Sequence, residues 1–314
     1  MQEAAISFPM LGENFIINPS ASFRVFGFPL YWYGVIIALG CFMGTFYGAR
    51  KSREFGIKSD DFVDVLLLAI PIGIVGARLY YVIFNFHEFS GDLLRIFNTR
   101  SGGLAIYGGV IGAVIAVIIM CRHKKISIGA VMDLGALGLL IGQSVGRWGN
   151  FINREVYGYE TDIFCRMGLT LPGYDTIYVH PLFLYESLLN TLGFILLHIY
   201  TKKKKRSFDG QIFLMYAAWY GLVRMILEGM RMDVYSLYLG STGIRVSQLL
   251  GGLSMLTAIL LIVILTVNSR KKGRVLWSEN KSNPEQVTAA NTSEGTESET
   301  DTAYESPTED KTDS

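Results

Sequence analysis

Seven long apolar segments, separated by shorter polar ones, follow one another along the chain. They cover about residues 30–49, 62–84, 103–121, 128–145, 181–200, 211–229 and 246–268. Each is close to the roughly 20 residues that a helix needs to cross the hydrocarbon core of a bilayer. The fourth departs most from this pattern, because it is short and contains Asp133 and Gln143. The pattern predicts an all-α polytopic membrane protein with seven transmembrane helices.

Basic residues are distributed unequally between the polar segments. Four, three, five and four Lys or Arg residues follow the first, third, fifth and seventh apolar segments, whereas the alternate segments together carry eight, all of them Arg. The positive-inside rule therefore predicts an N-terminus outside and a C-terminus in the cytoplasm, which an odd number of spans requires. The N-terminus lacks the positive region that begins a secretory signal, so we expect no cleaved segment.

The composition agrees with a membrane protein and separates a tail from the body of the chain. Half of the residues are apolar and 18% are charged, against about a quarter charged in soluble domains. The formal net charge of +1 combines ten acidic residues and two lysines in 279–314 with a basic remainder. We expect a seven-span transmembrane domain over 1–277 and a disordered acidic tail over 278–314. The tail is either a solvated extension or a regulatory, partner-binding segment.

The sixth apolar segment carries charged residues that lipid does not tolerate. Tyr220, Arg224, Glu228 and Arg231 are spaced four, four and three residues apart, which places them within about 80° of one another on a helix. An ionisable residue inside a membrane is costly and marks a functional site by default. Two interpretations remain open. Arg224 and Glu228 form an internal ion pair that holds helices together, or the positive excess that Arg231 adds binds an anion.

A second group of polar residues follows the fourth apolar segment, in the sequence GRWGNFINREVYG over 146–158. The planar guanidinium group of Arg147 matches the geometry of a phosphate. Asn150 and Asn153 add neutral hydrogen-bond donors. The glycines let the backbone approach a ligand closely, and Gly158 is the last residue of the segment. The alternative is an interfacial turn capped by Arg and Asn.

A third group is the glycine-rich segment 102–112. Gly108 and Gly112 form a small-xxx-small pair, which is typical of close helix packing. Tyr107 lies between these glycines near the outer interface, and its hydroxyl is a candidate for contact with substrate.

Three further residues have two interpretations each. His180, at the start of the fifth apolar segment, is a base, since histidine side chains titrate near neutral pH, or a structural residue before Pro181. Arg78 and Asp133 lie within spans and pair with each other or with the arginines above. The sequence has no HExxH, Cys/His cluster, Walker A or GxSxG motif, so we expect no metal, no cofactor and no nucleic-acid partner.

Arginines at the outer membrane boundary, with Asn and Tyr donors beside them, suit an anionic headgroup. The anion most available there is an anionic phospholipid. The residues therefore favour two classes of protein, an enzyme that processes phospholipids and a transporter or flippase for an organic anion or an anionic phospholipid.

Six segments of the chain also resemble those of one family, the prolipoprotein diacylglyceryl transferases of bacteria, in the same order. They are WYG (32–34), GAR (76–78), GGLAIYGG (102–109), GRWGNFINREVYG (146–158), HPLFLYE (180–186) and YGLVRMILEGMR (220–231). The fourth of these is long enough to be highly specific. The similarity covers about residues 20–270, and the acidic tail lies outside it.

The resemblance implies an activity and a place. A diacylglyceryl group moves from phosphatidylglycerol to the lipobox cysteine in the signal peptide of a preprolipoprotein, a thioether forms, and glycerol-1-phosphate leaves. The implied partners are therefore phosphatidylglycerol, these signal peptides and membrane lipid. The implied location is the bacterial cytoplasmic (inner) membrane, with the active site towards the outer leaflet.

The resemblance also implies roles for individual residues. Arg147 and Arg224 become ligands of the phosphate headgroup. The remaining substrate-binding residues complete that site, line it or orient an arginine, and they are Asn150, Glu155, Gly158, Tyr33, Tyr220, Glu228 and Arg231.

One departure from the family concerns the proton that the thiol must lose. Many members have His where this chain has Tyr107. A tyrosine hydroxyl, with a pKa near 10, is a poor base at neutral pH but a good hydrogen-bond donor. Tyr107, His180 and Arg224 are therefore the expected catalytic residues, with the proton acceptor left open between His180 and the phosphate of the substrate.

Overall fold

The computed structural model describes residues 4–12, 15–98, 102–203, 206–232, 238, 243–272 and 276. The predicted acidic tail, 278–314, lies outside these ranges. Seven long helices dominate the described chain. They are α1 (Trp32–Lys51), α2 (Ser59–Phe84), α3 (Ile106–Lys124), α4 (Ile128–Asn153), α5 (Leu182–Lys202), α6 (Gln211–Met230) and α7 (Val246–Lys272). All seven are long and apolar enough to cross a membrane, which confirms the predicted number.

Helix α4 is longer than the sequence pattern predicts. It continues to Asn153 instead of ending near residue 145, so that residues 146–153 form its last two turns rather than an interfacial turn. Gly149 is buried there, and a Cβ atom on it would lie 2.8 Å from the Tyr33 ring on α1. The glycines of this segment are therefore helix-packing positions. The helix ends at Arg154, whose φ of 53° is left-handed.

Glycines also bring pairs of helices into backbone contact, among them α1 with α4 and α2 with α3. Between α1 and α4, a Cβ atom placed on Gly44 would lie 2.6 Å from the Gly138 oxygen. Between α2 and α3, a Cβ atom placed on Gly76 would lie 2.5 Å from the Gly108 oxygen. Such short separations leave no room for a side chain. The small-xxx-small interpretation of the segment around Gly108 is thereby confirmed.

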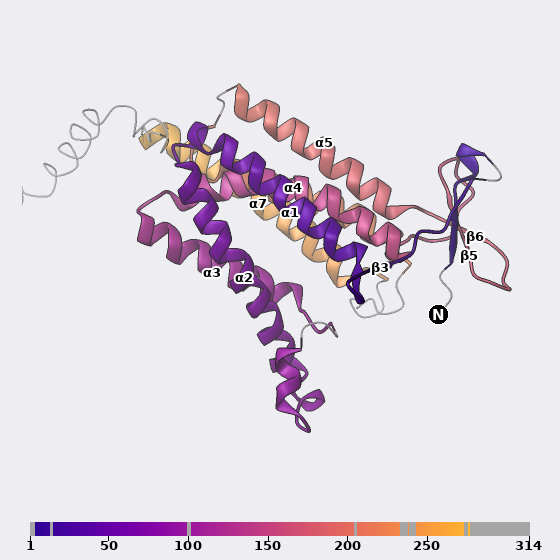
Figure 1. Ribbon diagram of the computed structural model, residues 1–314. Helices are drawn as coiled ribbons and strands as arrows, with labels where there is room; N and C mark the ends of the chain where they lie inside the picture. Colours follow the sequence, from indigo (N-terminus) through magenta and orange to yellow (C-terminus); the bar gives the residue numbers. More distant parts are fainter. Residues whose placement is uncertain are drawn as a thin grey trace, which may run out of the picture.

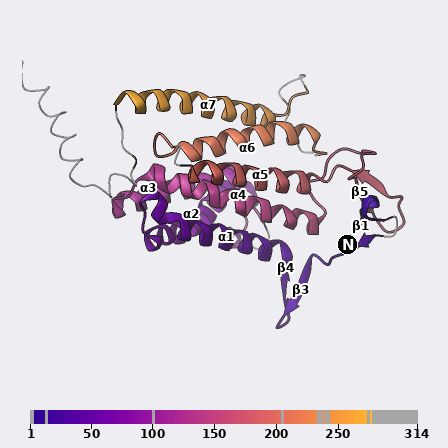
Figure 2. The same ribbon diagram turned by 90° about the horizontal axis from the view of Figure 1, so that it is seen from above.

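The helices surround α4, which packs against α1, α5 and α6 and contributes the centre of the largest apolar core, including Leu134, Leu137 and Leu140. Helix α7 lies along α6, on the far side from α1 (Figure 2). Helices α2 and α3 pack chiefly on each other, and this hairpin diverges from α1 along its length (Figure 1). The molecule thus consists of a central bundle and a splayed hairpin.

The prediction of an all-α fold is too narrow, because the described residues include two small antiparallel sheets. One has the order β2-β1-β5-β6 and the other is a β3–β4 hairpin. Their strands are β1 (Ala5–Ser7), β2 (Ile16–Ile17), β3 (Ser22–Val25), β4 (Phe28–Tyr31), β5 (Met167–Thr170) and β6 (Ile177–Val179). Strands of two to four residues are too short to show an alternating pattern. Four short 3₁₀ helices complete the described elements: η1 (Pro9–Leu11), η2 (Ser52–Phe55), η3 (Phe86–Glu88) and η4 (Leu93–Phe97).

The two ends of the bundle differ in structure and in charge. One end, which we call the sheet end, carries the sheets, the starts of α1, α5 and α7, and the C-termini of α4 and α6 (Figure 2). The opposite end, which we call the turn end, carries the turns 52–58, 125–127 and 203–210. Every lysine in the described ranges lies at the turn end, at or next to a helix terminus.

Candidate functional site

Three of the sequence motifs meet at the sheet end, around Gly158 and Tyr159. The Gly158 amide donates to the His180 carbonyl oxygen at 2.9 Å, and the His180 amide donates to the Tyr159 oxygen at 3.1 Å. The Tyr159 amide donates to the Met230 oxygen, at the end of α6, at 2.9 Å. The segment after α4 is therefore held between the start of α5 and the end of α6.

Gly158 is required at this junction by space. A Cβ atom on it would lie 2.7 Å from the His180 Cβ and 2.8 Å from the Met230 oxygen. Real Cβ atoms do not approach other heavy atoms so closely, so a side chain here would push two motifs apart.

A polar network surrounds Arg147 in the last turns of α4. Its Nη2 forms an ion pair with the Glu186 carboxylate, and its Nη1 donates to Asn150 Oδ1 at 3.1 Å. Asn150 Nδ2 in turn donates to Glu155 Oε1 at 2.8 Å. Since a guanidinium group has five N–H donors, Arg147 retains donors for a further anion. The structure thus brings together Arg147, Asn150 and Glu155, which the sequence had nominated.

Glu186 belongs to this network but had no role in the sequence analysis. It lies on the buried face of α5 and is 3% exposed. A buried carboxylate needs a partner of opposite charge, and Arg147 is that partner. The signal for Glu186 in the sequence is a carboxylate within the first turns of an apolar segment.

A second charged cluster lies at the sheet end of α6. Arg224 Nη2 is 2.7 Å from Glu228 Oε2, and Arg231 Nη1 is 3.9 Å from the same oxygen. The Glu228 side chain is only 7% exposed, whereas the two arginine side chains are 23% and 25% exposed. The structure therefore bears out the ion pair, and the binding of an anion stays a prediction. The Arg224–Glu228 ion pair exists within α6, and both arginine side chains stay partly exposed.

The two arginine clusters lie on neighbouring helices, and both lie nearer the sheet end than a hydrogen bond that joins these helices. Gln143 of α4 donates to the Tyr216 hydroxyl of α6 at 2.8 Å. Arg147 follows Gln143 by four residues. On α6, Tyr220 stacks on Tyr216 with ring centroids 5.9 Å apart, and Arg224 follows four residues later. Residues four apart share a face of a helix, so Arg147 lies about one turn and Arg224 about two turns beyond the Gln143–Tyr216 hydrogen bond, towards the sheet end.

Tyr33 and Tyr220 lie on the helices next to and within the arginine-bearing segments. The Tyr33 ring, in the first turn of α1, packs against Gly149 of α4. Tyr220 lies one turn before Arg224 on α6, nearer the turn end, and packs partly against the apolar core. Their contact with substrate stays a prediction.

Arg245 is a further residue that the sequence analysis did not nominate. It lies just before α7, is 3% exposed, and donates through Nη1 to the Glu228 carbonyl oxygen at 2.6 Å. Its Nη2 donates to the Arg231 oxygen and to the Tyr159 hydroxyl, the latter at 3.0 Å. Arg245 therefore fixes the end of α6, with Glu228 and Arg231 on it, against the segment after α4.

His180 is part of the junction through its backbone, and its ring points to α5. His180 Nδ1 is 3.3 Å from the Tyr185 hydroxyl, which is also 3.5 Å from Cys165 Sγ. The ring therefore has a hydrogen-bond partner next to the junction. This geometry is compatible with both interpretations of His180.

Tyr107 does not lie where the sequence analysis placed its hydroxyl. Its side chain is 59% exposed in the first turn of α3, and its ring centroid is 6.4 Å from that of Tyr80 rather than among the glycines. The Tyr107 ring cannot lie against Gly108, because Gly108 packs directly against the backbone of α2. Within the described ranges, Tyr107 forms no hydrogen bond with either arginine cluster.

Arg78 and Asp133 do not pair with each other or with the arginines of the site. Asp133, at the turn end, accepts hydrogen bonds from the backbone amides of Gly210 and Phe213, each at 2.9 Å, and lies 3.4 Å from Arg206. Arg78 instead donates to five backbone oxygens of the loop before α3, those of Arg95, Ile96, Asn98, Gly102 and Gly103. Both residues organise loops.

The fold and this site define a class of protein, a multi-pass membrane protein with arginines and carboxylates clustered at one end of its helices. A family model described as prolipoprotein diacylglyceryl transferase matches residues 20–264. The chain belongs to the prolipoprotein diacylglyceryl transferase family.

Individual relatives agree with this assignment. The chain is similar to a phosphatidylglycerol–prolipoprotein diacylglyceryl transferase of Enterococcus faecalis, with 42% identity over 260 residues, 81% of this chain and 92% of that protein. It is 41% identical over 263 residues to the protein of the same name from Bacillus cereus, covering 81% of this chain and 93% of that protein. A Bacillus mycoides protein of that name is 42% identical over 244 residues, 75% of this chain and 88% of its own length.

Proposed function

We propose that this chain transfers a diacylglyceryl group from phosphatidylglycerol to a cysteine thiol of prolipoproteins, the activity that its relatives' names state. The single observation that carries the site is the position of the Arg147 and Arg224 clusters on neighbouring helices, both on the sheet-end side of the Gln143–Tyr216 hydrogen bond. In the reaction, the sulfur atom forms a bond to the glyceryl carbon that carries the phosphate. The bond from that carbon to the phosphate oxygen breaks, and glycerol-1-phosphate leaves with the electron pair.

Charge development explains why arginines suit this reaction. The phosphate of phosphatidylglycerol is a diester with one negative charge, and the leaving monoester gains further charge as the bond breaks. Arg147 and Arg224 bind that developing charge more tightly than the charge of the ground state, which lowers the barrier. Glu186 and Asn150 hold the Arg147 guanidinium group in place, and Glu228 holds that of Arg224.

The thiol also has to lose its proton, because the thiolate is the nucleophile and a free cysteine thiol has a pKa of about 8.5. His180 and the phosphate of the substrate are the candidate acceptors. The position of His180 at the motif junction supports it as the protein's own base. Tyr107, on the splayed α2–α3 hairpin, is better suited to orient a substrate by donating a hydrogen bond than to take the proton.

The orientation in the membrane follows from charge. All described lysines lie at the turn end, which the positive-inside rule assigns to the cytoplasm. The sheet end, with its arginine clusters, then faces the outer leaflet of the bacterial cytoplasmic membrane. Phosphatidylglycerol and the signal peptide enter sideways from the bilayer.

The test separates an enzyme from a transporter or flippase. Detergent-solubilised protein is mixed with labelled phosphatidylglycerol and a lipobox peptide, and the thioether product is measured by mass spectrometry. An enzyme forms the product without a sealed membrane, whereas a transporter cannot. Absence of product from folded protein, combined with transport of phosphatidylglycerol in sealed vesicles, would reject the proposed function.

A further inference from the structure

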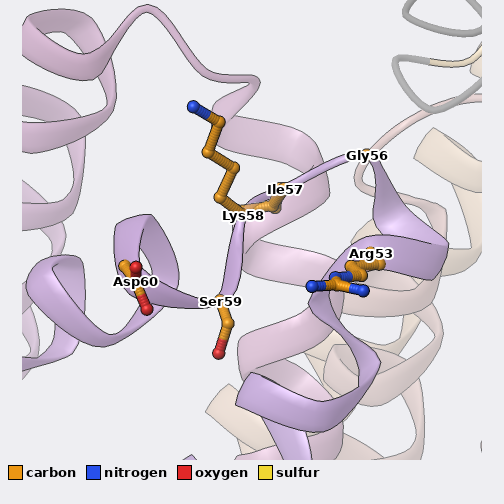
Figure 3. Close-up of a pocket in the computed structure, with 6 residues that line it drawn as sticks. All are labelled: Arg53, Gly56, Ile57, Lys58, Ser59 and Asp60. Carbon is orange, nitrogen blue, oxygen red and sulfur yellow. The ribbon is translucent and has the colours of Figure 1, made fainter.

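A hollow lies at the turn end, far along the helices from the arginine clusters, where α1 passes through η2 into α2 (Figure 3). It has a volume of about 490 Å³ and is lined by Arg53, Gly56, Ile57, Lys58, Ser59 and Asp60. A neighbouring hollow of about 420 Å³ is lined by Phe46, Ala49, Arg50, Arg53 and Ser59. Arg53 and Ser59 line both, so the two form one groove, which we call the α1–α2 groove.

The α1–α2 groove concentrates positive charge that the surrounding chain does not neutralise. Arg50, Arg53 and Lys58 line it, against the single acidic residue Asp60. Among the described residues, none of these three basic groups forms an ion pair. Neighbouring lysines do have acidic partners. Lys51 pairs with Glu54, and Lys124 lies 2.8 Å from Asp61 and 2.7 Å from Asp64.

The groove also offers neutral donors for a phosphate. Ser59 begins α2 and points its hydroxyl into the region beside Arg53 (Figure 3). No side chain caps the N-terminus of α2, so the first backbone amides of this 26-residue helix remain available. Guanidinium groups, a hydroxyl and free helix-terminal amides together match the acceptor oxygens of a phosphate.

One wall of the α1–α2 groove is apolar and leads along α1 towards the membrane interior. Phe42, Phe46 and Arg50 follow one another at intervals of four residues, on one face of the helix. Phe42 is 65% and Phe46 is 49% exposed, and the Arg50 guanidinium carbon lies 4.6 Å from the Phe46 ring centroid. A ligand that fills the groove therefore has an anionic head and an apolar tail.

We propose that the α1–α2 groove binds an anionic phospholipid of the leaflet at the turn end. Its phosphate contacts Arg53, Arg50 and Ser59, and one acyl chain lies along Phe46 and Phe42. The groove lies at the vertex from which the α2–α3 hairpin diverges from α1 (Figure 1). The bound lipid therefore links the splayed hairpin to the central bundle. This site is separate from the substrate site at the sheet end.

The alternative is that these basic residues only set the orientation of the first two spans. That role needs positive charge on the correct side of the membrane but no pocket and no particular arrangement. The two accounts differ in whether lipid contact depends on Arg50 and Arg53 or on any basic residues at this end.

Photolabelling tests the proposal. Full-length protein is placed in phosphatidylcholine bilayers that contain a small share of phosphatidylglycerol with a diazirine in its acyl chain. After irradiation, digestion at aromatic residues identifies the labelled peptides. We expect label near Phe42 and Phe46, and we expect Arg50→Gln/Arg53→Gln to lower it roughly tenfold, since each basic residue near the headgroups contributes a few-fold.

Two controls make the result decisive. Arg122→Gln/Lys125→Gln removes the same charge from the same end outside the groove and should leave the label unchanged. Equal label in wild type and the Arg50/Arg53 variant, or an equal loss in the control variant, would overturn the proposal. Loss of the label on adding inorganic phosphate would overturn it in favour of a soluble phosphate ligand. Transferase activity, measured on the same preparations, reports on the proposed function independently.

Discussion

Two buried carboxylates decide where the arginine side chains of the site point. Glu186 is 3% exposed and pairs with Arg147, and Glu228 is 6% exposed and pairs with Arg224. Each arginine side chain stays partly exposed, so its carboxylate holds one edge of the guanidinium group while the other edge remains accessible. Arginine suits this task because its planar group binds two partners at once.

Replacing Glu186 by Gln tests this positioning. The amide keeps the shape but loses the charge that orients Arg147, so we expect kcat to fall roughly 100-fold, the scale on which a misplacement of about 1 Å slows an enzyme. Glu160→Gln is the control, because Glu160 is an exposed acidic residue at the same end. Steady-state kinetics with a lipobox peptide measures both. Unchanged kcat in Glu186→Gln would show that Arg147 is oriented without this charge.

The residues of the site differ in how visible they are in the sequence. Arg147, Asn150 and Arg224 could be nominated because a charge or a cluster of donors stands out in an apolar context. Glu186 and Arg245 are less visible in the sequence, because their partners are distant along the chain. Glu186 pairs with a residue 39 positions away, and Arg245 binds the Tyr159 hydroxyl 86 positions away. Tyr107 was misplaced because its position depends on how α2 packs against α3.

At the scale of elements, glycine determines which helices pair. Helices α1 and α4 meet at Gly44 and Gly138, and α6 and α7 meet at Gly221 and Gly251. In lipid, apolar side chains give no hydrophobic drive for helices to associate, so close backbone packing becomes the main attraction. The same contact between α1 and α4 fixes Tyr33 beside Gly149.

Gly44→Ala and Gly135→Ala form a matched pair that tests this packing. A Cβ atom on Gly44 would lie 2.6 Å from the Gly138 oxygen, whereas one on Gly135 of α4 would meet nothing within 4 Å. We expect Gly44→Ala to destabilise by about 1–3 kcal/mol, the usual cost of overpacking. Gly135→Ala should be neutral or stabilising by up to about 1 kcal/mol, because alanine favours helix. Thermal unfolding in detergent measures both, and equal midpoints would contradict the account.

Hydropathy made the helices predictable, since each span needs a long apolar run. It did not reveal the end of α4, where Gly146 and Gly149, which pack against Ile37 and Tyr33 of α1, resemble helix breakers in the sequence. It also missed the sheets, because β1 pairs with β5 from the opposite half of the chain, Ile6 facing Leu169. Pairing over such a separation leaves no local pattern of hydrophobic and polar residues.

At the scale of the whole molecule, the two proposed sites lie at opposite ends. The sheet end carries the motif junction and the arginine clusters, and the turn end carries the lysines of the described residues and the α1–α2 groove. The family match ends at residue 264, before the acidic tail.

Removing residues 278–314 tests whether the tail contributes to the reaction. We expect the truncated chain to keep transferase activity within about twofold, because the family match ends at residue 264 and the composition of the tail predicts disorder. Activity of membrane preparations, normalised to protein amount, gives the comparison. A large loss in correctly inserted protein would mean that the tail has a direct role.

The central claim is that Arg147 and Arg224 bind the phosphate that leaves. Its most direct measurement is the kcat of Arg147→Ala for transfer from labelled phosphatidylglycerol to a lipobox peptide, with Arg24→Ala, an exposed arginine on β3, as the control. Removing a donor to a charged transition state costs roughly 10²–10³ in kcat, so we predict a loss of that size in Arg147→Ala and near-normal activity in Arg24→Ala. Near-normal activity in folded Arg147→Ala protein would contradict the claim.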